Sequence, residues 1–144
     1  MTSTPKAILA AAALVTASVV AAERDEKYTY LFPWVVVSAQ HSEYRDEALR
    51  FAEHFFGKTN CVQILPGSPG CCVWIDSLAS KAPPAAKGYV VIHLPERGTT
   101  ISVSSTQELA KAVDRLIALS RDDKGSKVLP VGLITSFPIP AEKQ

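Results

Sequence analysis

Two adjacent cysteines, Cys71 and Cys72, are the first residues of this chain that could carry out chemistry. They follow the turn "PGSPG" and begin the apolar run "CCVWI", and Cys61 is the only other cysteine. Redox sites favour C-x-x-C, and structural zinc sites pair their ligands at two- to four-residue spacing. Neither pattern occurs here, so no metal site is expected and a reactive thiol is only an alternative. In an oxidising compartment three thiols normally form one disulfide and leave one over, which makes these three residues disulfide candidates.

The pairing depends on the strands that hold the cysteines. If 61–65 and 71–75 are neighbouring strands, alternation of side chains sends Cys71 and Cys72 to opposite faces of the sheet. Only one of them can then share a face with Cys61. We therefore expect a central strand reached through a tight turn, with one cysteine facing the layer of Cys61 and the other buried alone.

A serine, a histidine and an aspartate lie near expected strand ends. Asp76 ends the strand "CCVWID", and Ser38 and His41 lie at and just after the end of the strand "PWVVVSA". Ser38, His41 and Asp76 are the residue types of a hydrolase's Ser-His-Asp triad. No G-x-S-x-G elbow supports it, so we interpret these residues as solvated strand ends and keep a small hydrolase as an alternative.

Other catalytic and cofactor motifs are missing from the sequence. No P-loop, dinucleotide fingerprint or H-E-x-x-H occurs, so no cofactor is expected. His54, on an expected helix, and His93, in the middle of an expected strand, are interpreted as packed or surface histidines. Most acidic residues lie on helix faces or in polar linkers, which does not suit the opposed carboxylates of a glycosidase.

Aromatic residues favour binding over catalysis. Tyr28, Tyr30, Phe32 and Trp34 lead into the folded part of the chain and combine polar surroundings with large apolar groups. They are the candidate binding residues, either as a stacking surface for a glycan or as a patch for a protein partner. Core packing is the simpler explanation for Trp34, and also for Trp74.

The N-terminus has the pattern of a secretory signal peptide. Lys6 precedes an apolar run over 7–22, and charge begins abruptly at Glu23. The run of about 16 residues is short for a membrane span of about 20 residues. We expect cleavage before Glu23 and export to the periplasm or medium. The alternative is an N-terminal membrane anchor, with membrane contact only if 7–22 is retained.

The charge balance argues against nucleic acid. The chain has 15 basic and 14 acidic residues, and loss of Lys6 with the leader makes the numbers equal. Binding to nucleic acid relies on clustered Lys and Arg that neutralise phosphates, whereas the basic residues here are scattered. No nucleic-acid partner is expected.

Alternating hydrophobic periods predict an α+β fold, in which a mixed β-sheet of about five to six strands packs against two helices. The helices are expected over 42–56, capped by Ser42 and Gly57, and from 106, behind the capping box of Ser105 and Glu108. The expected strands are 33–39, 61–65, 71–75, a hairpin of 89–94 and 99–104 that turns at Gly98, and an edge strand or extended tail within 128–137. The expected layout is a leader or anchor over 1–22, a linker over 23–32, one domain over 33–136 and a tail over 137–144.

The stretch 88–117, preceded by the strand, helix and strands of 34–75, resembles the small α/β domain that precedes the catalytic barrel in glycoside hydrolases of families 20, 67 and 84. The matching positions are those of a "gY.i" strand and an "i.I.a" strand, namely Gly88, Tyr89, Ile101, Val103 and Ser104. Two features depart from the family: the capping box at 105–108 replaces a Gly-rich step, and the barrel with its catalytic carboxylates has no counterpart in the sequence. A ferredoxin-like or propeptide-like βαββαβ layout also explains much of the pattern.

This resemblance implies a fold and a carbohydrate-associated setting, without hydrolysis. We therefore expect an exported, non-catalytic α/β module that binds a protein partner or a glycan, for example as an accessory subunit. A membrane-tethered subunit of a larger complex and the small hydrolase remain the alternatives.

Overall fold

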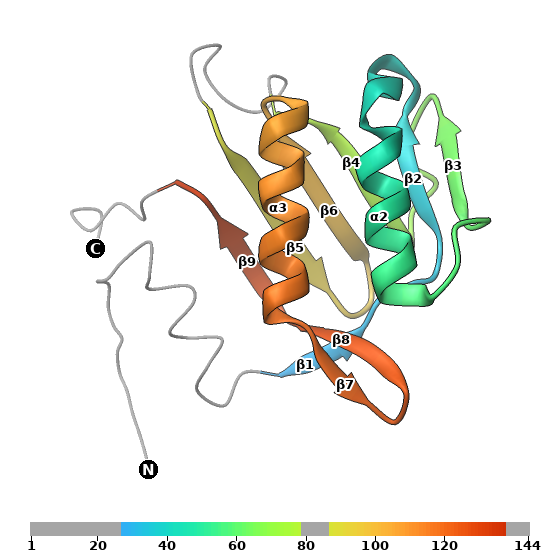
Figure 1. Ribbon diagram of the computed structural model, residues 1–144, viewed down its shortest axis with the longest axis vertical. Coiled ribbons are helices and arrows are strands. Elements are labelled where there is room, and N and C mark those ends of the chain that lie inside the picture. The colour runs from blue at the N-terminus through green and yellow to red at the C-terminus, as the bar shows by residue number, and fades with distance from the viewer. Residues whose placement is uncertain (1–26, 79–86, 138–144) are drawn as a thin grey trace.

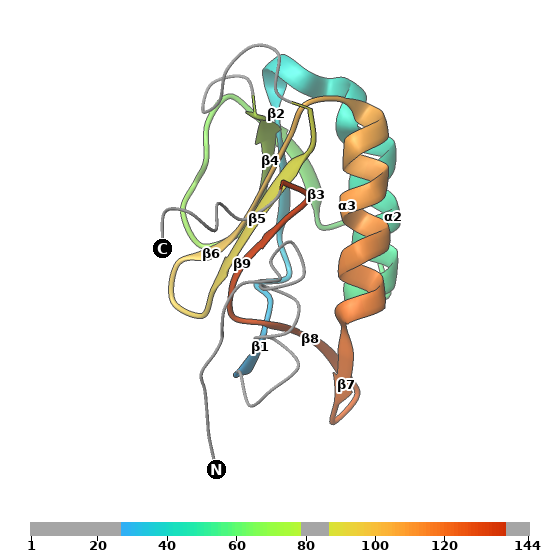
Figure 2. The ribbon, with the colours of Figure 1, turned by 90° about the vertical axis from the view of Figure 1, so that its left-hand side faces the viewer.

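A computed structural model describes residues 27–78 and 87–137. The leader or anchor expected over 1–22 and nearly all of the tail expected over 137–144 lie outside these residues. The described strands form a six-stranded mixed sheet, in the order β3-β2-β4-β6-β5-β9, and a three-stranded sheet, in the order β1-β8-β7. Both helices, α2 and α3, cover one face of the larger sheet (Figures 1 and 2). The expected α+β fold is confirmed.

The larger sheet is parallel on one side and antiparallel on the other. Its parallel strands are β2 (Val35–Ser38), β3 (Val62–Leu65), β4 (Val73–Ser77) and β6 (Gly98–Val103). The antiparallel strands are β5 (Tyr89–Leu94) and β9 (Gly132–Thr135). β2 is buried on both faces, which explains its run of three valines, whereas β4 buries Val73 and Ile75 and leaves Trp74 half-buried.

The helices pack through the apolar stripes predicted from the sequence. α2 (Arg45–Phe56) buries Ala48, Phe51, Ala52 and Phe55, and α3 (Thr106–Leu119) buries Leu109, Ala112, Val113 and Leu116. The Ser105 side chain caps α3 by accepting a hydrogen bond from the backbone N–H of Glu108. Between the helices, Arg50 of α2 forms an ion pair with Asp114 of α3 at 2.8 Å.

The start of the first helix differs from the prediction. Residues Ala39–Tyr44 form a 3-10 segment, η1, in which His41 has non-helical backbone angles. α2 therefore begins at Arg45, without a side-chain cap, and Ser42 is not its N-cap. The C-terminal prediction is confirmed, because Gly57 ends α2 in the left-handed conformation with φ of 70°.

The smaller sheet comes from segments expected to be irregular. β1 (Tyr28–Tyr30) lies within the expected linker, and β7 (Arg121–Asp123) lies where no strand was expected. β8 (Ser126–Pro130) pairs with both and is central in this sheet, whereas the later part of the same expected run forms β9 (Gly132–Thr135), an edge strand of the larger sheet as predicted. Pro130 is tolerated in β8 because β7 reaches only as far as Val128, so Pro130 has a strand neighbour on one side only.

The face of the larger sheet away from the helices carries apolar side chains. Ile92 of β5 and Leu133 of β9 are register partners and are 40% and 50% exposed. Register places Thr100 and Trp74 beside them in the same row. On the opposite face of the sheet, the apolar side chains are buried in the core between the sheet and the helices.

Candidate functional site

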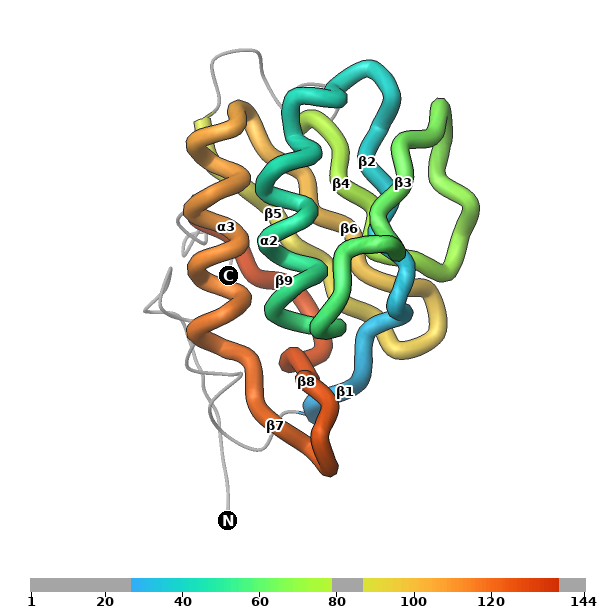
Figure 3. Tube along the Cα trace, turned by 45° about the vertical axis from the view of Figure 1, so that its right-hand side comes forward, coloured from blue at the N-terminus to red at the C-terminus, as the bar shows by residue number. Residues whose placement is uncertain are grey.

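A pocket of about 490 Å³ lies where three distant segments meet. Figure 3 shows β1, β7 and β8 gathered at the C-terminal end of α2, which is where the pocket opens. The walls come from the end of β1 and the residues after it, from the end of α2, and from the turn between β7 and β8. The lining residues are Tyr30, Leu31, Pro33, His54, Phe55, Phe56, Gly57, Lys58, Gly125, Ser126 and Lys127.

Tyr30 presents an aromatic ring at this pocket. Its hydroxyl donates a hydrogen bond of 2.8 Å to Asp123 Oδ2, and half of the residue is exposed. The hydrogen bond to this carboxylate is the main reason why the pKa of Tyr30 is raised. The phenol is thus held at its polar end while its ring stays accessible, as a stacking surface requires.

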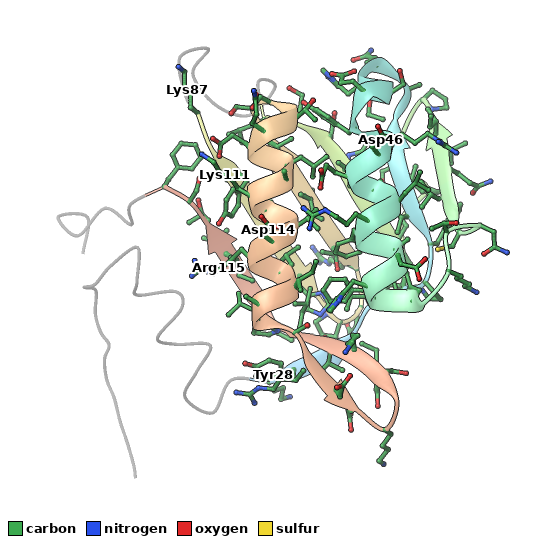
Figure 4. All side chains as sticks on the ribbon, viewed as in Figure 1. Tyr28, Asp46, Lys87, Lys111, Asp114 and Arg115 are labelled. Carbon is green, nitrogen blue, oxygen red and sulfur yellow. The ribbon has the colours of Figure 1, made fainter. Side chains whose placement is uncertain are left out.

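The other three predicted binding residues do not line the pocket. Arg121 lies over the ring of Tyr28 at 3.9 Å from its centroid, and Figure 4 shows Tyr28 at the base of the molecule beside β7. The Trp34 Nε1–H donates to the side-chain oxygen of Gln63 on the neighbouring strand, and Phe32 is half-buried. Of the four predicted aromatic residues, Tyr30 alone contributes to the pocket, together with its neighbours Leu31 and Pro33. Binding itself stays a prediction for all four.

His54 forms part of the wall contributed by α2. Ser120 Oγ donates to the carbonyl of Ile117 at 2.7 Å, so its single proton is used there. The 3.1 Å contact between His54 Nε2 and Ser120 Oγ must then be donated by the imidazole, which assigns the Nε2–H tautomer. Burial, followed by the charge of Lys127, lowers the pKa of His54 and keeps the ring neutral.

The pocket therefore combines three kinds of group that suit a sugar. Tyr30 and Phe56 offer aromatic surface, Ser126 offers a hydroxyl group, and Lys58 and Lys127 supply donors. No Asp or Glu is among the lining residues. Glycosidic cleavage needs two carboxylates across the bound sugar, and the lining residues supply neither.

Sequence reasoning did not find most of this site. Lys58 and Lys127 were not singled out, and His54 was interpreted as packed or on the surface. Lys127 lies far along the chain from His54 and Lys58, and no local motif joins the three residues. The one usable signal was the aromatic character of the segment that contains Tyr30.

The residues of the hypothetical hydrolase do not form a triad. The His41 Nδ1 lies 3.4 Å from Glu43 Oε2, and its ring stacks on Tyr44 with centroids 5.3 Å apart. Asp76 Oδ1 accepts a hydrogen bond of 2.6 Å from the backbone N–H of Ser77. Ser38 is buried at the end of β2, one strand from Asp76. Strand pairing brings Ser38 and Asp76 to the same end of the sheet, whereas His41 contacts Glu43 and Tyr44. Among the described residues no hydrogen bond joins the side chains of Ser38, His41 and Asp76.

The predicted disulfide is absent, because Cys61, Cys71 and Cys72 are all free. Strands β3 and β4 are not neighbours; β2 lies between them, with Val35 paired to both Val62 and Val73. Cys61 directly precedes Val62, and Cys72 directly precedes Val73. The backbones at these two cysteines are therefore separated by two strand spacings, roughly 9–10 Å. A disulfide needs Cα atoms within about 7 Å, so this pair cannot close. The predicted central strand is confirmed as β4, although it begins at Val73 and not at Cys71, and one cysteine of the adjacent pair, Cys72, is buried.

The three thiols are expected to differ in reactivity. Cys71 is exposed and should be alkylated first in the folded protein, whereas Cys72 is 1% exposed and burial raises its pKa, which disfavours the reactive thiolate. Intact mass after treatment with N-ethylmaleimide, without reductant, should show three labels in denaturant and fewer under native conditions. A single label in denaturant would mean that two cysteines are crosslinked and would contradict the structure.

Two further searches were confined to the described residues. In 27–78 and 87–137, no group of three or more His, Cys, Asp or Glu side chains is placed to hold a metal ion. In the same part of the chain, no helix has both the length and the apolar character needed to cross a membrane.

Comparison with known proteins identifies the fold. No protein-family model matches the sequence, and no curated protein matches it. A solved structure that is similar is the GH20 β-N-acetylhexosaminidase from Streptomyces coelicolor A3(2), with a TM-score of 0.58 and 16% identity over 78% of this chain. The chain corresponds to 24% of the length of that enzyme. At this identity the likeness shows a shared α/β fold, in agreement with the resemblance seen in the sequence.

Proposed function

We propose that this chain is an exported, non-catalytic α/β module that binds a saccharide in the pocket beside Tyr30, as an accessory part of a carbohydrate-active assembly. The observation that carries the proposal is the pocket itself, which offers an exposed aromatic ring and hydrogen-bonding groups without a lining carboxylate. The similarity to about a quarter of a β-N-acetylhexosaminidase supports a carbohydrate setting. Export is supported by the leader-like pattern of 1–22.

The structural neighbour suggests the first ligand to try. Because its name refers to N-acetylhexosamine, oligosaccharides of N-acetylglucosamine are the natural probes, and chitotetraose is long enough to fill the pocket and extend beyond it. The proposal does not require this sugar to be cleaved. It requires saturable binding at Tyr30 and no release of product during a long incubation.

Substitution of Tyr30 tests the site. Tyr30→Ala should weaken binding of chitotetraose by about tenfold, or about 1.4 kcal/mol, because the stacking surface is removed. Tyr30→Phe keeps the ring and loses only the bond to Asp123, so it should bind nearly as well. Isothermal titration calorimetry on the full chain measures both affinities.

Tyr28→Ala is the matched control. It removes an aromatic ring from the same strand, but a ring that Arg121 covers and that does not line the pocket. Its affinity should equal that of the wild type once folding has been checked by circular dichroism. Equal losses for Tyr28→Ala and Tyr30→Ala would place the binding elsewhere and count against the proposed site.

A protein partner is the second candidate, favoured by the exposed row on the open sheet face. Ile92 and Leu133 are adjacent and exposed, which is a common property of interaction surfaces. Binding there and binding at Tyr30 are separable, because the row and the pocket share no residue.

A further inference from the structure

The charges around the pocket are unbalanced among the residues that line it. Lys58 and Lys127 are cationic, His54 is neutral, and no lining residue is acidic. Lys58 follows the last turn of α2, and Lys127 lies in β8, so the two cations approach the pocket from different elements. A ligand in the pocket would therefore have a positive charge on more than one side.

The nearest acidic groups offset only part of this charge. Asp122 forms an ion pair with Lys127 at 2.7 Å but is mostly exposed and outside the lining, and Asp123, also outside the lining, accepts a hydrogen bond from the hydroxyl of Tyr30. Among the described residues Lys58 makes no ion pair. At His54 the charge of Lys127 helps to lower the pKa of the imidazole after the larger effect of burial, and Asp122 opposes it with a smaller effect. The positive charge of Lys127 therefore outweighs the negative charge of its partner at this wall of the pocket.

Tyr30, Lys58 and Lys127 lie on three different walls of the same pocket. A sugar ring that lies against Tyr30 carries its substituents outward, toward the end of α2 and the turn between β7 and β8. A carboxylate on such a substituent would meet the lysine side chains, whose ammonium groups are good partners for oxyanions. A neutral sugar offers these ammonium groups only uncharged oxygen atoms, so neither positive charge would be compensated.

We infer that the saccharide recognised by this pocket is anionic, with a uronic acid carboxylate held by Lys58 and Lys127 while the neighbouring ring stacks on Tyr30. This inference rests on the proposed saccharide binding and specifies the class of sugar. Beyond the proposed function, the inference predicts that the ligand must carry negative charge, which a neutral amino-sugar polymer does not.

The test compares two tetrasaccharides that share N-acetylglucosamine and differ in charge. Hyaluronan tetrasaccharide alternates this sugar with glucuronate, whereas chitotetraose has no carboxylate. With the full chain at low ionic strength, hyaluronan tetrasaccharide should bind about tenfold more tightly than chitotetraose. Its affinity should fall as salt is raised, while that of chitotetraose should stay nearly constant.

Single-charge variants locate the effect. Lys58→Met should weaken hyaluronan binding by about fivefold and leave chitotetraose binding unchanged; Lys127→Met should act in the same direction. Lys87→Met is the matched control, because Lys87 is exposed at the opposite end of the molecule from the β7–β8 turn (Figure 4). It removes the same charge without touching the pocket and should change neither affinity.

The outcomes separate this inference from the proposed function. Equal affinities for the two sugars, or a preference for chitotetraose, would overturn the charge requirement and leave saccharide binding standing. A preference for hyaluronan that survives both Lys58→Met and Lys127→Met would show that other groups hold the carboxylate, which also overturns the inference. Failure of both sugars to bind would overturn the proposed function and the inference together.

Discussion

Gly98→Ala is expected to lower the free energy of unfolding by about 3 kcal/mol. Gly98 begins β6 with φ of +101°, and a Cβ atom there would lie 2.4 Å from the carbonyl oxygen of Cys72 and 2.9 Å from its nitrogen. Both are backbone atoms of the segment that enters β4, and this oxygen already accepts a hydrogen bond of 2.9 Å from the N–H of Thr99. The clash cannot be relieved by rotating a side chain, so the strands must separate. Urea unfolding followed by circular dichroism measures the loss.

Gly70→Ala is the matched control for this substitution. Gly70 has a similar φ of +109°, but nothing lies within 4 Å of the position its Cβ would take. It should lose only the cost of the unfavourable backbone conformation, about 1–2 kcal/mol. If the two variants lose the same stability, the close approach of β6 to Cys72 is not what requires glycine at position 98.

Gly98 also shows how far the sequence could predict this fold. The hairpin of β5 and β6 was predictable because "PERG" supplies a local turn between two β-branched runs, and a glycine is the residue such a turn favours. Its contact with Cys72 involves a residue 26 positions away and depends on which strands pair. In the same way, the stripes of α2 and α3 were readable from spacing alone, whereas the 3-10 turn at His41 was not.

Strand order was the main limit. The connection over 66–72 carries the chain from β3 on one side of β2 to β4 on the other side, and this separates Cys61 from Cys72, which the disulfide prediction assumed to lie on neighbouring strands. β1 and β7 are three residues each and too short to produce a periodic pattern. Because the pocket is made where these short strands meet the end of α2, its lysines could not be brought together by sequence reasoning.

His93 joins the two sheets through its imidazole, in which both ring nitrogens form hydrogen bonds. The ring is 1% exposed; Nε2 lies 3.2 Å from the carbonyl oxygen of Thr29 and 2.8 Å from its hydroxyl, and Nδ1 lies 2.7 Å from Thr99 Oγ1. A carbonyl only accepts, so Nε2 carries the proton and Nδ1 accepts from Thr99. The interpretation of His93 as a packed histidine is confirmed, with the added finding that it links β1 to β5 and β6.

Replacement of His93 is expected to cost about 3 kcal/mol of unfolding free energy when the new side chain cannot bond. His93→Leu would leave the hydroxyls of Thr29 and Thr99 without this partner, and the second of these is buried. His93→Gln keeps a donor and an acceptor and should lose clearly less. Urea unfolding at pH 8, where the imidazole is neutral in both states, measures these differences without a contribution from titration.

The same residue should make stability depend on pH with a definite sign. Burial lowers the pKa of His93 below its ordinary value, against a smaller opposing effect of the Thr29 hydrogen bond. As pH falls below about 6.5, the unfolded chain takes up a proton that the folded protein resists, so unfolding is favoured. The loss is at most about 1.4 kcal/mol per pH unit for one group and ends at the folded pKa.

Carboxylates also titrate in acid, so the informative quantity is the difference in unfolding free energy between wild type and His93→Gln. This difference should shrink from pH 8 to pH 5. His54→Gln removes a less buried imidazole whose pKa is also lowered and should give a smaller change. A His93→Gln difference that is constant over this range would show that His93 is protonated equally easily in both states, which its enclosure between the two sheets does not allow.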